Sequence, residues 1–160
     1  MNLRSKATTE KAKTASFADV CSVRVGPSLF GLPIRHILEI VGSVLPQAVP
    51  LAPPFVGGLV HYRGDVLTTV SMRFLLSLPP LHAPQAILVL ESPGGAFGLL
   101  VDSVVEVLTL AESDLEPNPA TLGDACKHLF TGAYKLKSNL LVMLDPEGLD
   151  PLRLSTAQAA

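Results

Sequence analysis

Apolar residues occur along the chain in short runs that are separated by turn-forming residues. Short runs rich in valine, isoleucine and leucine, bounded by glycine, proline, serine or asparagine, are typical of β-strands. The pattern predicts strands over residues 20–25, 29–34, 37–41, 59–62, 66–70, 86–91, 97–101, 104–110, 131–136 and 140–145. No helical run of the length that a parallel crossover requires separates successive strands, so we expect antiparallel meanders.

Several of these strands are joined by strong turn sequences. Glycine permits positive φ angles and proline presets φ, so both residues favour a reversal of the chain. The turns are Gly26-Pro27-Ser28, Arg63-Gly64-Asp65, Ser92-Pro93-Gly94-Gly95 and Lys137-Ser138-Asn139. The second turn predicts a hairpin with Gly64 at its tip.

Only two short segments of the sequence have a helical pattern. Residues 72–76 predict one helical turn, and residues 121–130 have weak helical spacing. Residues 46–54 and 77–84 are rich in proline, which cannot donate to a strand ladder, so both are expected to be extended connections. No convincing internal repeat is evident. The pattern therefore predicts an all-β fold, a β-barrel or a pair of barrels, with at most two short helices.

The composition agrees with one globular domain. The chain has 160 residues, 48% hydrophobic and 16% charged, which is enough to bury a core. No apolar run approaches the roughly 20 residues of a membrane-spanning helix. The formal net charge of −2 gives no reason to expect nucleic acid as a partner.

The two ends are expected to be tails. Residues 1–16 carry four basic side chains and no apolar segment follows them, so we expect a flexible basic tail rather than a signal peptide. Residues 17–152 form the expected domain, and residues 153–160 a short C-terminal tail. Without an export signal, Cys21 and Cys126 are expected to be reduced structural thiols of a cytoplasmic protein.

The sequence contains no recognisable catalytic or cofactor motif. Nucleotide-binding glycine loops and the nucleophile elbow are absent. The four histidines lack the paired spacing of zinc ligands, so no metal and no cofactor are predicted. The tripeptide Arg63-Gly64-Asp65 is a chance match to an extracellular recognition motif. The scattered carboxylates are expected to be solvated surface charges: Asp102, Glu106, Asp145 and Glu147.

Two strands share an unusual arrangement. Ile37-Leu38-Glu39-Ile40 and Val104-Val105-Glu106-Val107 each place one carboxylate within a branched apolar strand. One interpretation is a barrel wall whose carboxylate faces water. The other is a partner groove, in which exposed apolar side chains supply area and the charge supplies register. Both can hold for one strand, because alternate residues face opposite sides.

The order of these features resembles the CheW family of chemosensory coupling proteins. The resemblance covers residues 17–152 and depends on the order and spacing of several short motifs rather than on any one of them. The motifs are Phe30-Gly31-Leu32-Pro33-Ile34, Ile37-Leu38-Glu39-Ile40, Pro54-Phe55-Val56-Gly57-Gly58, Tyr62-Arg63-Gly64, Gly98-Leu99-Leu100-Val101-Asp102-Ser103-Val104, Glu116-Pro117-Asn118-Pro119 and Phe130-Thr131-Gly132-Ala133.

The resemblance implies two SH3-like five-stranded β-barrels packed together, with the proline-rich segments at or near the crossings between them. It implies a non-enzymatic cytoplasmic adaptor, recruited to membrane-associated arrays. Its partners would be the tip of methyl-accepting chemoreceptors and the regulatory domain of a CheA-type histidine kinase, with other CheW-like domains in rings as a further option. The alternatives are a coupling protein of a paralogous system, such as type IV pilus twitching, or a degenerate relative that fills array positions.

Matching motif positions assign a receptor-binding set to this chain. The residues are Ile37, Glu39, Arg63, Val105 and Val107, with Gly64 shaping the hairpin. Arginine suits such an interface because its guanidinium offers five donors in a fixed fork.

Three positions near the set, His61, Thr68 and Ser71, depart from the family pattern. Ser71 replaces an aspartate that is a possible partner of Arg73 or Arg63.

Overall fold

The computed structural model describes residues 16–159, apart from the side chains of Ala125, Cys126 and residues 157–159. It has ten strands, and each predicted strand overlaps one of them. They are β1 (Phe17–Val25), β2 (Ser28–Pro33), β3 (Ile37–Val44), β4 (Val56–Tyr62), β5 (Asp65–Ser71), β6 (Gln85–Ser92), β7 (Gly95–Val101), β8 (Ser103–Ala111), β9 (Phe130–Lys135) and β10 (Leu140–Leu144). The all-β class is confirmed, whereas the basic tail predicted over residues 1–16 lies almost wholly outside the described residues.

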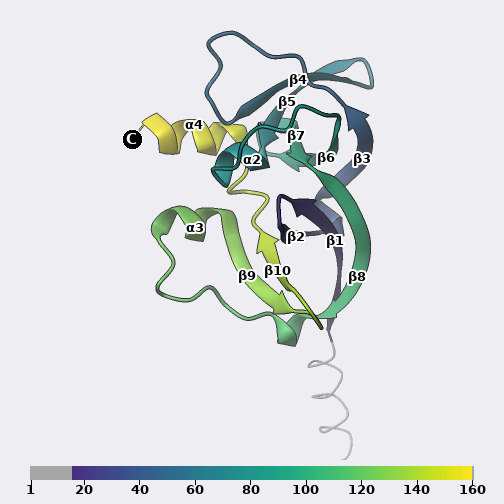
Figure 1. The fold of residues 1–160 in the computed structure, drawn as a ribbon, viewed down its shortest axis with the longest axis vertical. Coiled ribbons are helices and arrows are strands. Elements are labelled where there is room, and N and C mark those ends of the chain that lie inside the picture. Colours follow the sequence, from purple (N-terminus) through teal and green to yellow (C-terminus); the bar gives the residue numbers. More distant parts are fainter. Residues whose placement is uncertain (1–15, 160) are drawn as a thin grey trace, which may run out of the picture.

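The strands form two five-stranded sheets, one above the other in Figure 1. The lower sheet has the order β8-β1-β2-β10-β9 and the upper sheet the order β3-β6-β7-β5-β4. Most neighbours are antiparallel, as predicted. The exceptions are β10 with β2 and β5 with β7, which run parallel.

Short helices lie between and after the strands. They are the 3₁₀ turns η1 (Ile34–His36) and η2 (Glu112–Asp114), and the α-helices α2 (Met72–Leu75), α3 (Asp124–Leu129) and α4 (Pro151–Ala159). The first two α-helices were predicted, but α4 forms where a tail was expected. Leu149 and Leu154, before and within α4, are buried in the central core, and this burial stabilises a helix that a solvated tail would not form. No helix within residues 16–159 is long and apolar enough to cross a membrane.

The two sheets are built from an internal repeat, so the sequence-based expectation of no repeat was wrong. Residues 19–41 align without a gap on residues 86–108, which superposes Phe30-Gly31-Leu32 on Phe97-Gly98-Leu99. The strand registers repeat as well. Ile37 pairs with Leu90 in the upper sheet, and the equivalent Val104 pairs with Val23 in the lower sheet.

The repeat exchanges one strand between the sheets. The chain leaves the lower sheet after β2, passes through η1 and places β3 against β6 of the upper sheet. It returns after β7, passes Asp102 and places β8 against β1 of the lower sheet. Each sheet is therefore completed by a strand that comes, in the chain, directly after two strands of the other sheet: β3 follows β1 and β2, and β8 follows β6 and β7.

The crossings are not made by the long proline-rich segment. Residues 46–54 join β3 to β4 within the upper sheet, so their expected place at a crossing was wrong. Residues 77–84 also join elements of the upper sheet, but the carbonyl of Pro79 accepts a hydrogen bond from Arg73, which is bound to the crossing residue Asp102.

One apolar core joins the two sheets. Its buried members include Cys21, Leu32, Phe55 and Leu99. Ile37 and Val104, equivalent residues near the start of the two exchanged strands, pack against it. A smaller cluster fills the interior of each sheet, with the members Val20, Leu29, Tyr134, Leu141 and Met143 in the lower sheet and Leu67, Ile87, Val89 and Leu100 in the upper.

Each sheet is closed by an isolated bridge from the segment that follows its exchanged strand. Gln47 pairs with Leu59 on β4, and Glu116 pairs with Ala133 on β9. A glycine with positive φ, Gly58 or Gly132, lies directly under each bridging segment. The two sheets are thus equivalent barrels closed in the same way.

Candidate functional site

The turn between β4 and β5 presents Arg63 to solvent. Arg63 and Gly64 form a two-residue turn with φ values of 48° and 82°. Two successive positive φ angles define the type I′ turn, whose twist matches that of a hairpin and which favours glycine at the second position. The Arg63 side chain is 72% exposed, as the sequence predicted for the hairpin tip.

Arg63 is bound to Glu39 of β3. The guanidinium donates through Nε to Oε2 at 3.3 Å and through Nη2 to Oε1 at 3.2 Å. The guanidinium carbon also lies 5.5 Å from the ring centroid of Tyr62, within the range of a cation–π contact. Arg63 first, and the Tyr62 hydroxyl next, lower the pKa of the Glu39 carboxyl. The result is an oriented ionic cluster at the mouth of the upper barrel.

The other predicted residue on β3 has a different environment. Ile37 is partly buried against the central core, so it holds β3 in place rather than facing a partner. The large exposed side chains of this strand are Leu38 and Ile40, which are 52% and 46% exposed. They lie on the face of β3 opposite to Glu39, because side chains alternate along a strand.

Val105 and Val107 of β8 are exposed, as the partner-groove interpretation required. Their exposed fractions are 47% and 55%. The repeat makes them the counterparts of Leu38 and Ile40, and both strands carry a register irregularity at the same place, at Leu38 in β3 and at Val105 in β8. No hydrogen bond or ion pair within residues 16–159 joins Val105 or Val107 to the Arg63 cluster.

Sequence reasoning therefore missed Leu38, Ile40 and Tyr62. The signal for the first two was present, because the motif around Glu39 matches the motif around Glu106 residue by residue. Exposed counterparts of Val105 and Val107 could have been located by that match. Figure 1 shows β3 and β8 on the same side of the molecule, the right side in this view.

A second ionic cluster joins the two barrels. Arg73 of α2 donates to Asp102 through Nε at 2.8 Å and through Nη2 at 2.7 Å. The amide of Gly26, in the β1–β2 turn, donates to the same carboxylate at 2.8 Å. The Arg73 and Asp102 side chains are 15% and 17% exposed. The expectation that Asp102 is a solvated charge was therefore wrong.

The serine at position 71 leaves neither Arg63 nor Arg73 without a partner. Arg73 binds Asp102 and Arg63 binds Glu39. Ser71 has a local role, since its hydroxyl accepts a hydrogen bond from the amide of Phe74 and caps α2.

The Asp102 cluster predicts that the free energy of unfolding decreases at acid pH. Arg73 in the first place, assisted by the Gly26 amide, lowers the pKa of Asp102. A carboxyl whose folded pKa is depressed stabilises the fold above its unfolded pKa of about 3.9 and loses this contribution as the pH falls through the folded value. Urea unfolding between about pH 6 and pH 2 should therefore show the stability advantage of the wild type over Asp102→Asn shrinking below about pH 4. An advantage that stayed constant to the lowest pH would contradict this role.

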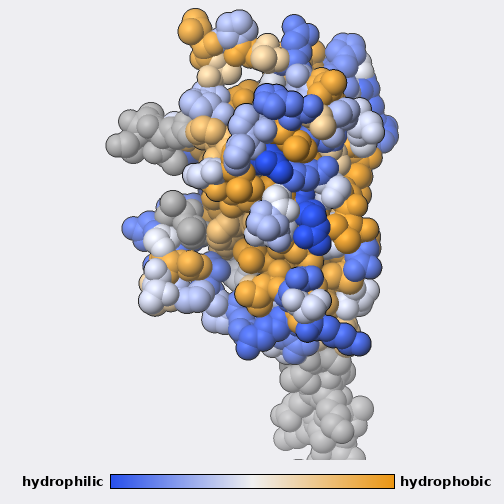
Figure 2. Space-filling model, viewed as in Figure 1, coloured by the Kyte–Doolittle hydropathy of each residue, from blue (hydrophilic) through white to orange (hydrophobic). Residues whose placement is uncertain are grey.

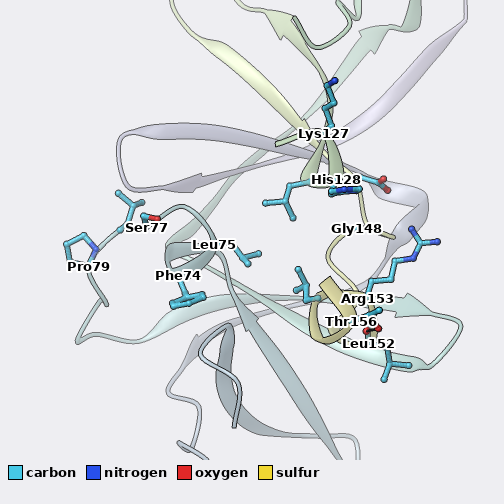
Figure 3. A pocket seen from close by; sticks show the side chains of 14 residues that line it. Phe74, Leu75, Ser77, Pro79, Lys127, His128, Gly148, Leu152, Arg153 and Thr156 are labelled. Carbon is cyan, nitrogen blue, oxygen red and sulfur yellow. Dashed lines mark hydrogen bonds between the residues drawn. The ribbon is translucent and has the colours of Figure 1, made fainter. Parts of the chain in front are cut away.

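The opposite side of the molecule carries an apolar recess. Figure 3 shows it between α2, α3 and α4, with Phe74 and Leu75 on its floor and His128 above. Its volume is about 1240 Å³. Figure 2 shows hydrophobic atoms in the hollow on this side, at the level between α4 and α3. Within the described residues no group of three potential metal ligands occurs.

Comparisons with known proteins agree with this architecture. The model of the CheW-like domain family matches residues 19–151. A probable chemotaxis protein CheW of Rhizobium etli is 26% identical over 82% of this chain and 86% of its own length. The chemotaxis protein CheW of Helicobacter pylori is 30% identical over 77% and 75%. The scaffolding protein TtCheW of Thermoanaerobacter tengcongensis superposes with a TM-score of 0.75, over 85% of this chain and 94% of that one, at 22% identity, which shows the shared fold.

Two further similarities extend to proteins that are not named CheW. Protein FrzA of Myxococcus xanthus is 29% identical over 72% of this chain and 73% of its own length. The chemotaxis protein CheA of Klebsiella aerogenes is 33% identical over 66% of this chain, a segment that makes up 16% of that larger protein. Since the family model spans both barrels and both crossings, the chain belongs to the CheW-like domain family of chemotaxis coupling proteins.

Proposed function

We propose that this chain is a non-enzymatic adaptor that couples methyl-accepting chemoreceptors to a CheA-type histidine kinase in a bacterial chemosensory array. It would act in the cytoplasm and be recruited to membrane-associated receptors. The single observation that carries the proposal is the oriented Arg63–Glu39–Tyr62 cluster, which involves β3, the strand whose opposite face exposes Leu38 and Ile40. An exposed ion pair together with exposed apolar side chains suits a reversible contact with a partner. The apolar side chains supply contact area, and the charges fix how the partner is aligned.

The receptor would contact the β3 and β8 side. Exposed Val105 and Val107 supply apolar area there, and Arg63 supplies a fixed fork of donors. In the free protein the Glu39 carboxylate oxygens already bind two nitrogens of the Arg63 guanidinium at 3.2–3.3 Å. Because the guanidinium is held in place before the partner arrives, less side-chain entropy is lost on binding. Ile37 would act indirectly, by holding β3 against the core.

The kinase would be engaged through its own domain of this type. The similarity to a segment of a CheA protein supports a partner with the same architecture. A further option is a ring of CheW-like domains, in which each domain binds two neighbours through the ends of its two equivalent barrels. Neither contact needs a catalytic group.

The proposal is tested by a charge-reversal cycle. Arg63→Glu and Glu39→Arg should each weaken binding to receptor-tip fragments from the same genome by about tenfold or more, because a reversed charge replaces an attraction at the interface by a repulsion. If Arg63 contacts the receptor directly, the double reversal restores the internal pair but not the binding. Isothermal titration or fluorescence anisotropy gives the dissociation constants.

A matched control is Glu147→Arg, an exposed charge reversal beside α4. It should leave receptor binding unchanged. Unchanged binding for both Arg63→Glu and Glu39→Arg would refute the site, and full recovery in the double reversal would reduce the pair to a structural role.

The second candidate is a coupling protein of a paralogous chemosensory system, and the similarity to FrzA favours it over a degenerate relative. The two candidates share the site and differ in the cognate kinase. Pull-down with each CheA-type kinase of the source organism separates them, because the true partner is retained and the others are not.

A further inference from the structure

The two crossings between the barrels differ at one charged position. The repeat makes Arg35, in the crossing from β2 to β3, the counterpart of Asp102 in the crossing from β7 to β8. Asp102 is bound by Arg73 and by the Gly26 amide. Arg35 is exposed, and its side chain has no hydrogen bond or ion pair within residues 16–159. The first crossing therefore offers a guanidinium to another molecule, whereas the second is closed by an ion pair.

A cavity lies beside Arg35. Its volume is about 490 Å³, within the ~300–1,000 Å³ of small-molecule sites. The apolar part of its lining includes Val20 of β1 and Met143 and Leu144 of β10, which are 1–5% exposed. Figure 1 shows these two strands in the lower barrel, where they lie on either side of β2. The cavity is therefore lined by one barrel and by the crossing that leaves it.

Tyr134 of β9 also lines the cavity. The residue is only 4% exposed, and its hydroxyl has no hydrogen-bond partner within the described residues. Among these residues no side-chain polar atom is both fully buried and unpaired, so the hydroxyl is in contact with solvent-accessible space, and the cavity is the space that Tyr134 lines. Polar groups in nearly buried positions are normally hydrogen-bonded, so a molecule in the cavity is the expected partner.

The Tyr134 hydroxyl is a donor at neutral pH. Burial first, and then the charges of Glu112 and Asp114, raise the pKa of Tyr134 above the ordinary value of about 10 for a tyrosine. The hydroxyl therefore remains protonated, and it can donate to a carboxylate oxygen of a bound molecule.

Basic and acidic side chains together surround the cavity. They are Arg35 and His36 of η1, Glu112 of η2 and Asp145 after β10. No ion pair joins any of them to another residue within residues 16–159. Asp145 accepts one hydrogen bond, from the Glu147 amide to Oδ1 at 3.1 Å. Opposite charges that do not neutralise one another, beside an apolar wall, match a molecule that carries both charges and an apolar group.

We propose that this cavity binds a small zwitterion of the size of an α-amino acid with an apolar side chain. The ligand carboxylate accepts from the Arg35 guanidinium and from the Tyr134 hydroxyl. The ligand ammonium faces the carboxylates of Glu112 and Asp145, and the apolar side chain of the ligand packs against Met143. The site goes beyond the receptor and kinase coupling proposed above, since it uses none of the receptor-binding residues.

Isothermal titration of the full chain tests the site with L-leucine as the probe. L-leucine should bind one-to-one with a dissociation constant below about 1 mM. Two analogues of leucine keep one charge each, since 4-methylpentanoate lacks the ammonium and 3-methylbutylamine lacks the carboxylate. Each analogue should bind about tenfold or more weakly than leucine, because charged groups of the cavity then lose their partner.

Two variants assign the contacts to residues. Tyr134→Phe removes only the hydroxyl, and Arg35→Gln removes the charge of an exposed side chain. Each should weaken the binding of L-leucine about tenfold or more. Arg153→Gln, at an exposed arginine of α4, is the matched control and should bind L-leucine as the wild type does. A dissociation constant above about 1 mM for L-leucine, equally tight binding of either analogue, or unchanged binding by Arg35→Gln would each overturn the proposal.

Discussion

Asp102→Ala is expected to lower the free energy of unfolding by about 2–4 kcal/mol. The carboxylate accepts from Arg73 twice and from the Gly26 amide once, and its loss leaves a nearly buried guanidinium without its counter-charge. The effect is large because Asp102 lies at the crossing from β7 to β8, where one side chain joins α2 of the upper barrel to the β1–β2 turn of the lower. Urea unfolding monitored by circular dichroism measures it.

The matched control is Glu106→Ala, an exposed carboxylate on the same stretch of chain with no side-chain partner among the described residues. It should change stability by less than about 0.5 kcal/mol. Arg73→Ala should resemble Asp102→Ala, and the double variant should lose less than the two single losses together, because both remove one interaction. Additive losses would contradict the assignment of this pair as the link between the barrels.

Gly58→Ala is expected to lower the free energy of unfolding by a similar amount, about 2–4 kcal/mol. Gly58 has a φ of 123°, and a Cβ there would lie 2.6 Å from the carbonyl oxygen of Gln47. That carbonyl accepts from the Leu59 amide at 2.8 Å in the bridge that closes the upper barrel. The methyl group must therefore displace backbone, which cannot move without breaking the closure.

Gly42→Ala is the control for the intrinsic effect of the substitution. Gly42 lies in β3, has no positive φ, and a Cβ there would meet nothing within 4 Å. This variant should be neutral or slightly stabilising, because alanine restricts the unfolded chain. Equal stabilities of Gly58→Ala and Gly42→Ala in urea would show that the bridge is not essential to the barrel.

The strands could be predicted from the sequence because their signals are local. Runs of branched apolar residues bounded by turns such as Arg63-Gly64 specify strand and hairpin without reference to the rest of the chain. The exchange of β3 and β8 could not be predicted this way, since the partner of each strand is set by burial of Ile37 and Val104 in a shared core. The repeat itself was missed because only a few positions, such as Phe30-Gly31-Leu32, remain identical.

The hairpin of the candidate site could be predicted from the local sequence Arg63-Gly64-Asp65. The receptor-binding role of Arg63 and Glu39 came from the family resemblance and stays a prediction. The bond between Arg63 and Glu39 and the exposure of Leu38 and Ile40 depend on how β3 lies beside β4 and β5, which no local pattern encodes. The Asp102 pair was misjudged for the same reason, because its partner Arg73 belongs to another element and faces it only after both crossings are made.

Co-sedimentation with receptor-containing membrane vesicles tests the central claim, that this chain couples receptor to kinase. Vesicles that carry a chemoreceptor from the same genome should bring down its CheA-type kinase only when this chain is present. The Arg63→Glu variant should abolish that dependence, whereas Glu147→Arg should preserve it. Kinase that sediments equally well without the chain, or a chain that stays in the supernatant, would contradict the coupling function.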